Sequence, residues 1–398
     1  MNSGLHHKVN HLGKISIVML FFSVLLLPLL GKAFHLKNIV SLNEKRELAP
    51  FPAVISDIKS LQQFSKAFER YYDDHFIFRD SLIFLGNYIR LNYFSSSPNP
   101  KVIIGKEGWL YYRGNITNLS EAYALSSPLT QDQLIQLQSS LEAKRNWLAT
   151  KGIRYLLVIA PDKESIYPEF LPANYSGKVN CLDQFLDHLR LHSDIDVLDL
   201  RAELRRAKED HPVYFKTDTH WNDYGGFMAC NGIIKRLRGQ FFGMELLSLA
   251  DYKITNQKVG RMDLSNMLAM GDLMLEDAPI VTKISRQRAH SCELKYELPG
   301  AVKIDGAPYF ATECTADKKA ALPRAVVLGD SFSRYLVPYL SESFRRAVFL
   351  HVWDSSPAVQ KSAIEHEMPD VVVEEIVERL LKRLLSKPVE QNLSSGLR

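Results

Sequence analysis

From residue 130 onward, short runs of apolar residues alternate with segments whose apolar positions recur at helical spacing. The runs predict buried strands at 155–159, 196–200, 324–328, 347–352 and 370–373, and the periodic segments predict helices at 130–150, 182–191, 224–237, 332–344, 358–367 and 376–385. Apolar strands that alternate with amphipathic helices are typical of a sheet covered on both faces. The pattern therefore predicts an α/β fold, a three-layer α/β/α arrangement with a mostly parallel sheet.

The regions around this alternating core differ from it in composition. Residues 35–100 predict an extended, proline-containing lead-in followed by helices, and residues 101–386 contain the predicted α/β domain. Within that domain the alternation lapses between 241 and 322, which predicts an irregular excursion of loops and short strands. Residues 387–398 predict a disordered tail.

The N-terminus carries the strongest compositional shift. Residues 15–30 are almost purely apolar, Lys8 and Lys14 precede them, and the first forty residues contain no acid. This pattern favours an uncleaved signal anchor with its N-terminus inside, while a cleaved signal peptide is the alternative. We expect residues 1–34 to form a cytoplasmic stub and an inner-membrane anchor, with the rest of the chain in the periplasm.

Composition bounds the function classes. The chain of 398 residues is 46% hydrophobic and 24% charged, which is ordinary for a globular protein. Its net charge of +4 comes from interspersed charges of both signs, which argues against nucleic-acid binding.

The four cysteines, Cys181, Cys230, Cys292 and Cys314, show neither CxxC nor zinc-ligand spacing. An exported chain allows a disulfide, for which Cys292 with Cys314 is the favoured pair, and four unpaired thiols are the alternative. We expect no metal and no cofactor.

The segment 323–333 holds the most informative local pattern, because four apolar residues lead into Gly329, Asp330 and Ser331 before a helical segment. A strand that turns sharply into a helix exposes the next hydroxyl at the helix N-terminus, where free N–H groups stabilise negative charge. Ser331 is therefore a candidate nucleophile, with a helix-capping serine as the structural alternative.

A base and an orienting acid lie upstream. Asp218 and His220 are two residues apart, so in an extended or loop conformation they point the same way and the carboxylate can hold the imidazole in one tautomer. Together with Ser331 they supply the parts of a nucleophilic triad, in which His220 takes the serine proton and Asp218 stabilises the imidazolium.

Further candidates surround the triad. The N–H groups of Ser331 and Phe332 could hold an oxyanion, with Asn266 as a side-chain donor, and Arg334 and Tyr335 could contact an acceptor. Elsewhere, Lys163 and Tyr167 are interpreted as surface loop residues, and the aromatic cluster Trp109, Tyr111 and Tyr112 as core packing rather than a sugar platform.

A family resemblance rests on these motifs. Gly329-Asp-Ser-Phe-Ser333 and Asp218-Thr-His220-Trp221 resemble the SGNH hydrolase-like family of alginate O-acetyltransferases, the AlgJ/AlgX type, and further matching segments lie at 43–46, 74–79, 105–110, 161–167 and 369–379. As in that family, the Asp-x-His element precedes the serine element. Nothing resembling the carbohydrate-binding module of AlgX-like members follows Arg379, so the layout is closer to AlgJ.

The resemblance implies an SGNH hydrolase-like fold and a periplasmic enzyme that acetylates exopolysaccharide hydroxyls, with a multipass membrane acyltransferase as the acetyl supplier. It assigns Ser331 as nucleophile, His220 as base and Asp218 as orienting acid. Two alternatives stay open from the sequence: a polysaccharide O-acetylesterase with the same triad, and a non-catalytic carbohydrate-binding assembly subunit.

Overall fold

The computed structural model describes residues 15–23, 48–52, 58–76, 79–113, 128–173, 181–298, 309–314, 322–351 and 355–386. Of the predicted anchor, residues 15–23 are helical, and the remainder lies outside the described residues, as do the segment 43–46 and the tail 387–398. Within the described part of the chain, no helix combines the length and the apolar character needed to cross a membrane.

The chain divides into two compact units, one of residues 1–98 with 266–270 and the other of residues 99–265 with 271–398. The first unit contains helices α2 (Ile58–His75) and α3 (Arg79–Phe94). The Ala49 N–H donates to Asp74 Oδ2 at 2.8 Å, and the Phe51 ring packs on Tyr71 at 5.1 Å, so the extended segment before α2 is tied to that helix.

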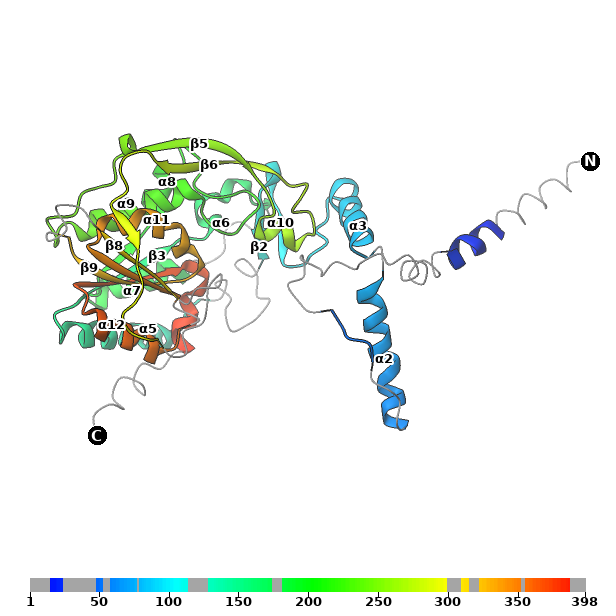
Figure 1. Ribbon diagram of the computed structural model, residues 1–398, viewed down its shortest axis with the longest axis horizontal. Helices are drawn as coiled ribbons and strands as arrows, with labels where there is room; N and C mark the ends of the chain where they lie inside the picture. Colours follow the sequence, from blue (N-terminus) through cyan, green and yellow to red (C-terminus); the bar gives the residue numbers. More distant parts are fainter. Residues whose placement is uncertain are drawn as a thin grey trace, which may run out of the picture. The chain divides into compact units, whose positions relative to one another are not determined.

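The second unit is built on a seven-stranded sheet in the order β4-β3-β11-β9-β10-β8-β7. Strands β3, β8 and β9 of this sheet are labelled in Figure 1. Its strands are β3 (Arg154–Ala160), β4 (Val197–Asp199), β7 (Ala289–Ser291), β8 (Tyr309–Cys314), β9 (Arg324–Gly329), β10 (Arg346–His351) and β11 (Val371–Val377). The five from β4 to β10 run parallel, whereas β8 and β7 add an antiparallel edge. The predicted parallel sheet is thus present, and the excursion extends it into a mixed one.

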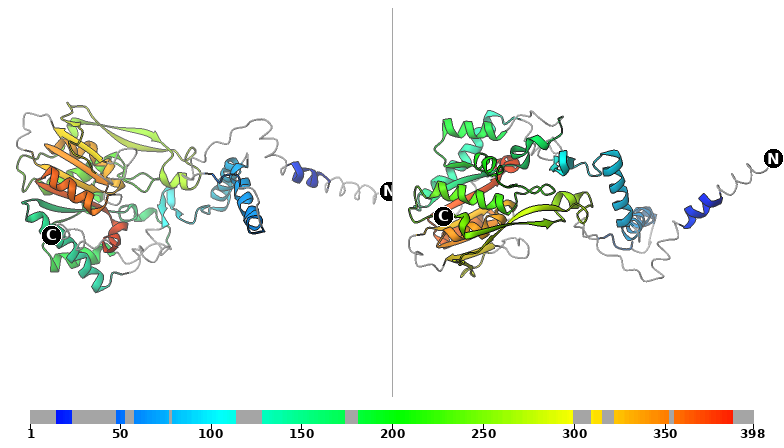
Figure 2. Two further views of the ribbon diagram at one scale, coloured as in Figure 1. Left: turned by 60° about the horizontal axis from the view of Figure 1, so that its bottom comes forward. Right: turned by 90° about the horizontal axis from the view of Figure 1, so that it is seen from above.

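Helices cover both faces of the sheet (Figure 2). Alternate residues of β3 belong to two separate hydrophobic cores, one on each face of the sheet. Leu156 and Val158 pack with α8 (Arg201–Ala207), α9 (Asp223–Leu237) and α11 (Val337–Leu340). Leu157 and Ile159 pack with α5 (Gln131–Ala149), α7 (Cys181–His192) and α12 (Pro357–Glu367). Because a strand points successive side chains to opposite faces, a strand buried on both sides reads as a continuous apolar run. This confirms the three-layer arrangement.

Shorter elements complete the unit. They are β1 (Val102–Ile104) paired with β2 (Leu110–Tyr112), the helix α6 (Lys163–Ile166), and the 3-10 segments η1 (Lys106–Gly108), η2 (Pro168–Phe170), η4 (Leu249–Asp251), η6 (Ser331–Tyr335), η7 (Ser341–Ser343) and η8 (Glu378–Ser386).

The excursion forms a two-stranded antiparallel ribbon, β5 (Tyr252–Val259) with β6 (Glu276–Lys283), and the short helix α10 (Asp263–Met267) lies between them in sequence.

The predicted disulfide between Cys292 and Cys314 is wrong. Cys292 is a free thiol, and the register between β7 and β8 places Cys314 opposite Ala289 rather than opposite Cys292.

Two predicted helices are also wrong. The segment 332–344 is broken into η6, α11 and η7, with Pro338 in the first turn of α11. The last predicted helix, 376–385, is the end of β11 followed by η8. Strand β11 extends beyond the predicted strand 370–373 because the fold can bury Glu374. The Glu374 carboxylate accepts from Lys144 Nζ at 2.6 Å and from Tyr155 Oη at 2.6 Å.

Candidate active site

The nucleophile turn follows β9 at the carboxyl edge of the sheet, where ligands of parallel α/β folds bind. Asp330 fixes this turn: its Oδ1 accepts the Phe332 N–H at 2.9 Å and its Oδ2 accepts the Val377 N–H at 2.8 Å. Its own N–H donates to Glu375 Oε2 at 3.1 Å. These hydrogen bonds hold the turn against the neighbouring strand β11, and Ser331 is exposed.

The Asp-x-His loop lies between α8 and α9. The Asn222 side chain caps α9 by accepting the Gly225 N–H at 3.0 Å, which sets where the loop ends. The fully buried Trp221 donates its indole N–H to the Phe332 carbonyl at 3.0 Å. This bond joins the histidine loop directly to the nucleophile turn, although the two are 111 residues apart in sequence.

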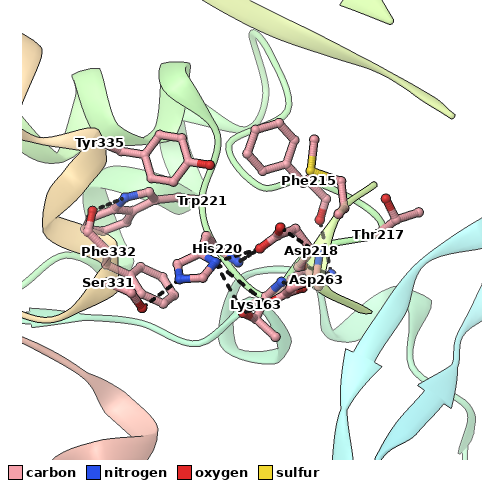
Figure 3. Close-up of polar contacts among 12 residues, drawn as sticks. Lys163, Phe215, Thr217, Asp218, His220, Trp221, Asp263, Ser331, Phe332 and Tyr335 are labelled. Atoms are coloured by element: carbon pink, nitrogen blue, oxygen red, sulfur yellow. Dashed lines mark hydrogen bonds and ion pairs between the residues drawn. The ribbon is translucent and has the colours of Figure 1, made fainter. Parts of the chain in front are cut away.

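Figure 3 shows that the three predicted side chains form a continuous hydrogen-bonded chain. His220 Nε2 lies 2.7 Å from Ser331 Oγ, and His220 Nδ1 lies 2.6 Å from Asp218 Oδ1. Burial raises the pKa of Asp218, but the hydrogen bonds and charge of His220 outweigh burial and hold that pKa below its usual range. An ionised carboxylate only accepts, so Nδ1 carries the proton and Nε2 is left to accept from the Ser331 hydroxyl.

A buried lysine braces the loop from the end of β3. Lys163 Nζ donates to the carbonyl oxygens of Phe215 at 3.1 Å, Lys216 at 3.0 Å and Asp218 at 2.6 Å. Its side chain is 2% exposed, so the interpretation as a surface loop residue is wrong. Burial lowers the pKa of Lys163 to about 8, and the carboxylates of Asp263 and Asp218 oppose that shift.

Asp263, from α10, also contacts the loop. Its carboxylate accepts from the Thr219 N–H and hydroxyl, and its Oδ2 lies 3.8 Å from His220 Nδ1. Asp218, His220 and Asp263 thus offer three possible metal-ligand atoms within 4.8 Å of one another. Both Asp218 oxygens accept hydrogen bonds, Oδ1 from His220 and Oδ2 from the Asp263 N–H. These bonds explain why the two acids lie close to each other and to His220.

Comparison with known proteins places the chain in a family. The profile of the SGNH hydrolase-like domain of acetyltransferase AlgX matches residues 102–378, which include the whole site. The chain belongs to this family.

The chain is also similar to curated proteins named as probable alginate O-acetylases AlgJ. The chain is 24% identical over 282 residues to the probable alginate O-acetylase AlgJ of Pseudomonas aeruginosa, covering 67% of this chain and 64% of the relative. It is 29% identical over 168 residues to AlgJ of Pseudomonas syringae, covering 42% of this chain and 41% of the relative. The chain therefore spans less than two thirds of the length of these relatives.

A solved structure shares the fold of this chain. The sulfonyl adduct of PatB1 from Bacillus cereus superposes with a TM-score of 0.52 at 17% identity, covering 70% of this chain and 97% of that one. At this identity the likeness extends to the fold alone. It agrees with the α/β architecture predicted from the sequence.

The structure also places the remaining predicted site residues. Phe332 packs its ring 4.8 Å from the His220 ring, but its N–H is already bound to Asp330, so it is not a free oxyanion donor. Arg334 lies on the Tyr335 ring at 4.8 Å and donates to the Tyr335 hydroxyl at 2.9 Å, three residues after Ser331 in sequence. Burial raises the pKa of Tyr335 to about 12, against the opposing charge of Arg334. Asn266 lies in α10, and its role as a donor stays a prediction.

Sequence reasoning missed Lys163 and Asp263 as parts of the site. A signal existed for both, because Lys163 comes three residues after the end of a strand and Asp263 comes three residues before the predicted donor Asn266. Trp109 and Tyr111 are buried, at 3% and 0% exposure, which confirms their interpretation as core packing.

Proposed function

We propose that this chain is a periplasmic O-acetyltransferase that moves acetyl groups onto polysaccharide hydroxyls through an acyl-Ser331 intermediate. The observation that carries the proposal is the chain of short contacts from Asp218 through His220 to the exposed Ser331 hydroxyl, with heavy-atom distances of 2.6 Å and 2.7 Å. Such an arrangement fits general-base activation of a serine.

In the first half reaction, Ser331 Oγ attacks the carbonyl carbon of an acetyl donor while its proton passes to His220 Nε2. The Ser331 N–H is the first of the 3-10 turn and has no intrahelical acceptor, so it is available to the oxyanion. The intermediate collapses as the donor's leaving group departs with the proton from His220. The products are acetyl-Ser331 and neutral His220.

In the second half reaction, an acceptor hydroxyl gives its proton to His220 Nε2 and attacks the acetyl carbonyl. A new ester bond forms, the bond to Ser331 Oγ breaks, and the proton returns to Ser331. Asp218 stays ionised throughout and stabilises the imidazolium in both halves. Ser331 is exposed, which allows a large acceptor to approach.

The acceptor we propose is an exopolysaccharide. The curated relatives are named as probable alginate O-acetylases, and the exposed Arg334 beside the nucleophile is suited to an acidic sugar. We further propose that the apolar segment 15–30 anchors the chain in the inner membrane and that a multipass acyltransferase supplies acetyl groups there.

The experiment uses purified protein with p-nitrophenyl acetate as donor and acidic and neutral oligosaccharides as acceptors, followed by mass spectrometry of the sugars. A transferase should place acetyl on a sugar and release correspondingly less acetate. Acetate release that no sugar diverts, together with deacetylation of an acetylated polymer, would instead identify an O-acetylesterase. The absence of both activities in the folded protein would favour a non-catalytic assembly subunit.

A further inference from the structure

Asp263 touches the Asp-x-His loop at three points. Its Oδ1 accepts the Thr219 N–H at 2.8 Å, its Oδ2 accepts the Thr219 hydroxyl at 2.5 Å, and its own N–H donates to Asp218 Oδ2 at 3.1 Å. A fourth bond runs alongside, from the Ser265 N–H to the Thr217 carbonyl at 3.2 Å. The start of α10 therefore holds each of the three residues that precede His220.

The same carboxylate also places charge beside the base. Asp263 Oδ2 lies 3.8 Å from His220 Nδ1, on the side of the ring that faces away from Ser331. Burial and the neighbouring Asp218 charge raise the pKa of Asp263, while the Thr219 contacts and the charge of His220 oppose that shift.

Other charged groups approach the imidazole less directly. Lys163 contacts the Asp218 carbonyl, Arg334 lies on the Tyr335 ring, and Arg379 lies on the Phe332 ring at 5.1 Å. Each of these cations is separated from the ring by a backbone or an aromatic group. The two carboxylates, in contrast, face Nδ1 itself.

We propose that Asp263 is a positioning acid of this site. It fixes the loop that carries Asp218 and His220, and its charge stabilises the imidazolium that forms in each half reaction. This inference rests on the proposed function, because it assumes that His220 is the base. It also gives the excursion a role, since the segment between β5 and β6 completes the site that the sheet edge begins.

The test compares Asp263→Asn with Asp277→Asn in p-nitrophenyl acetate turnover. Asparagine keeps the shape of the side chain but removes its charge, whereas Asp277 is an exposed acid on the same ribbon, 3.6 Å from Lys258. For Asp263→Asn we expect kcat to fall about tenfold with little change in KM, which is the size of effect that a lost charge near a developing cation produces. The acid limb of the kcat/KM profile should move to lower pH by about half a unit or more, because one anion beside the imidazolium is gone. Asp277→Asn should match the wild type in both respects.

A second variant separates charge from structure. Thr219→Val removes the hydroxyl that anchors the carboxylate and that lies 3.4 Å from His220 Nδ1, but it keeps the Asp263 side chain itself. We expect kcat to fall several-fold, with a smaller movement of the acid limb than in Asp263→Asn. This variant also serves as the test if Asp263→Asn does not fold. Folded Asp263→Asn with the kcat and the acid limb of Asp277→Asn would overturn the inference, and so would Thr219→Val with full kcat.

His220→Ala distinguishes this inference from the proposed function. If His220→Ala is inactive while Asp263→Asn behaves like Asp277→Asn, only the role of Asp263 fails. If His220→Ala keeps wild-type turnover, the proposed function itself fails.

Discussion

Replacing Lys163 with methionine tests whether a buried ammonium holds the Asp-x-His loop in place. Methionine fills a similar volume but removes the donor from the carbonyl oxygens of Phe215 and Asp218, whereas the Lys216 carbonyl still accepts the Leu110 N–H at 2.9 Å. Each unsatisfied buried acceptor costs about 1–3 kcal/mol, and removing the desolvated charge returns part of that sum. We therefore expect a net loss of about 2–4 kcal/mol in the free energy of unfolding.

The loss in activity should exceed what this destabilisation alone would cause. Because Asp218 shares the loop with His220, a shift of the freed carbonyls moves the acid and the base relative to Ser331. A displacement of about 1 Å in such a site can cost about a hundredfold in rate. We expect kcat/KM to fall about ten- to a hundredfold at a temperature where the variant is fully folded.

The assay is p-nitrophenyl acetate turnover, with thermal unfolding followed by circular dichroism, and Lys208→Met is the matched control. Lys208 also donates to a carbonyl oxygen, that of Ile166 at 2.7 Å, but it is more exposed and its carbonyl lies outside the histidine loop. Lys208→Met should keep near-normal activity. If Lys163→Met has the activity and the unfolding temperature of Lys208→Met, the bracing role assigned to Lys163 is refuted.

Two further predictions concern packing and pH. In α9, an added Cβ at Gly226 would lie 2.6 Å from the Tyr335 carbonyl oxygen, whereas at Gly232 it would meet a movable Leu200 methyl at 2.8 Å. Gly226→Ala should therefore lower both the unfolding temperature and turnover, although alanine favours a helix over glycine by about 1 kcal/mol. Gly232→Ala should keep turnover, and equal turnover and unfolding temperature in the two variants would contradict the packing argument. Burial, followed by the charge of Asp162, raises the pKa of Glu378 to about 7, so its contribution to stability is complete below the unfolded pKa of about 4.3 and is lost as the pH rises through 7. Glu378→Gln should flatten the fall in unfolding temperature between pH 5 and 8, and an unchanged slope would count against the shift.

Local sequence patterns predicted most of the helices and strands of the fold. The runs 155–160, 325–328 and 347–350 are apolar because both of their faces are buried, and Thr130 with Gln133 forms the capping box that starts α5. The grouping of Asp218, His220 and Ser331 was predictable for a similar reason: Asp218 and His220 are two residues apart, and Ser331 comes two residues after the end of a strand.

The features that the sequence did not predict depend on contacts between distant segments. Strand β11 continues through Glu374 and Glu375 because the fold supplies Lys144 and Tyr155 to one and the Asp330 N–H to the other. Charged residues are rarely fully buried, so a sequence pattern does not predict such partners.

Lys163 and Asp263 reach the Asp-x-His loop from positions 55 and 45 residues away from Asp218. Periodicity does not encode contacts of this range, which explains why the two residues were missed. The short 3-10 turn at Ser331 similarly replaces the predicted helix, because Asp330 and its neighbours fix the turn from outside it.

The central claim is that Ser331 carries the acetyl group. The direct measurement is intact-protein mass spectrometry after mixing with p-nitrophenyl acetate and rapid acid quench, on the wild type and on Ser331→Ala. The variant should fold normally, because it loses one exposed hydroxyl whose hydrogen bond is worth about 1 kcal/mol. The account predicts one added acetyl group on the wild type, located at Ser331 by fragmentation, and none on the variant. Undiminished acetylation and donor turnover by folded Ser331→Ala would contradict it.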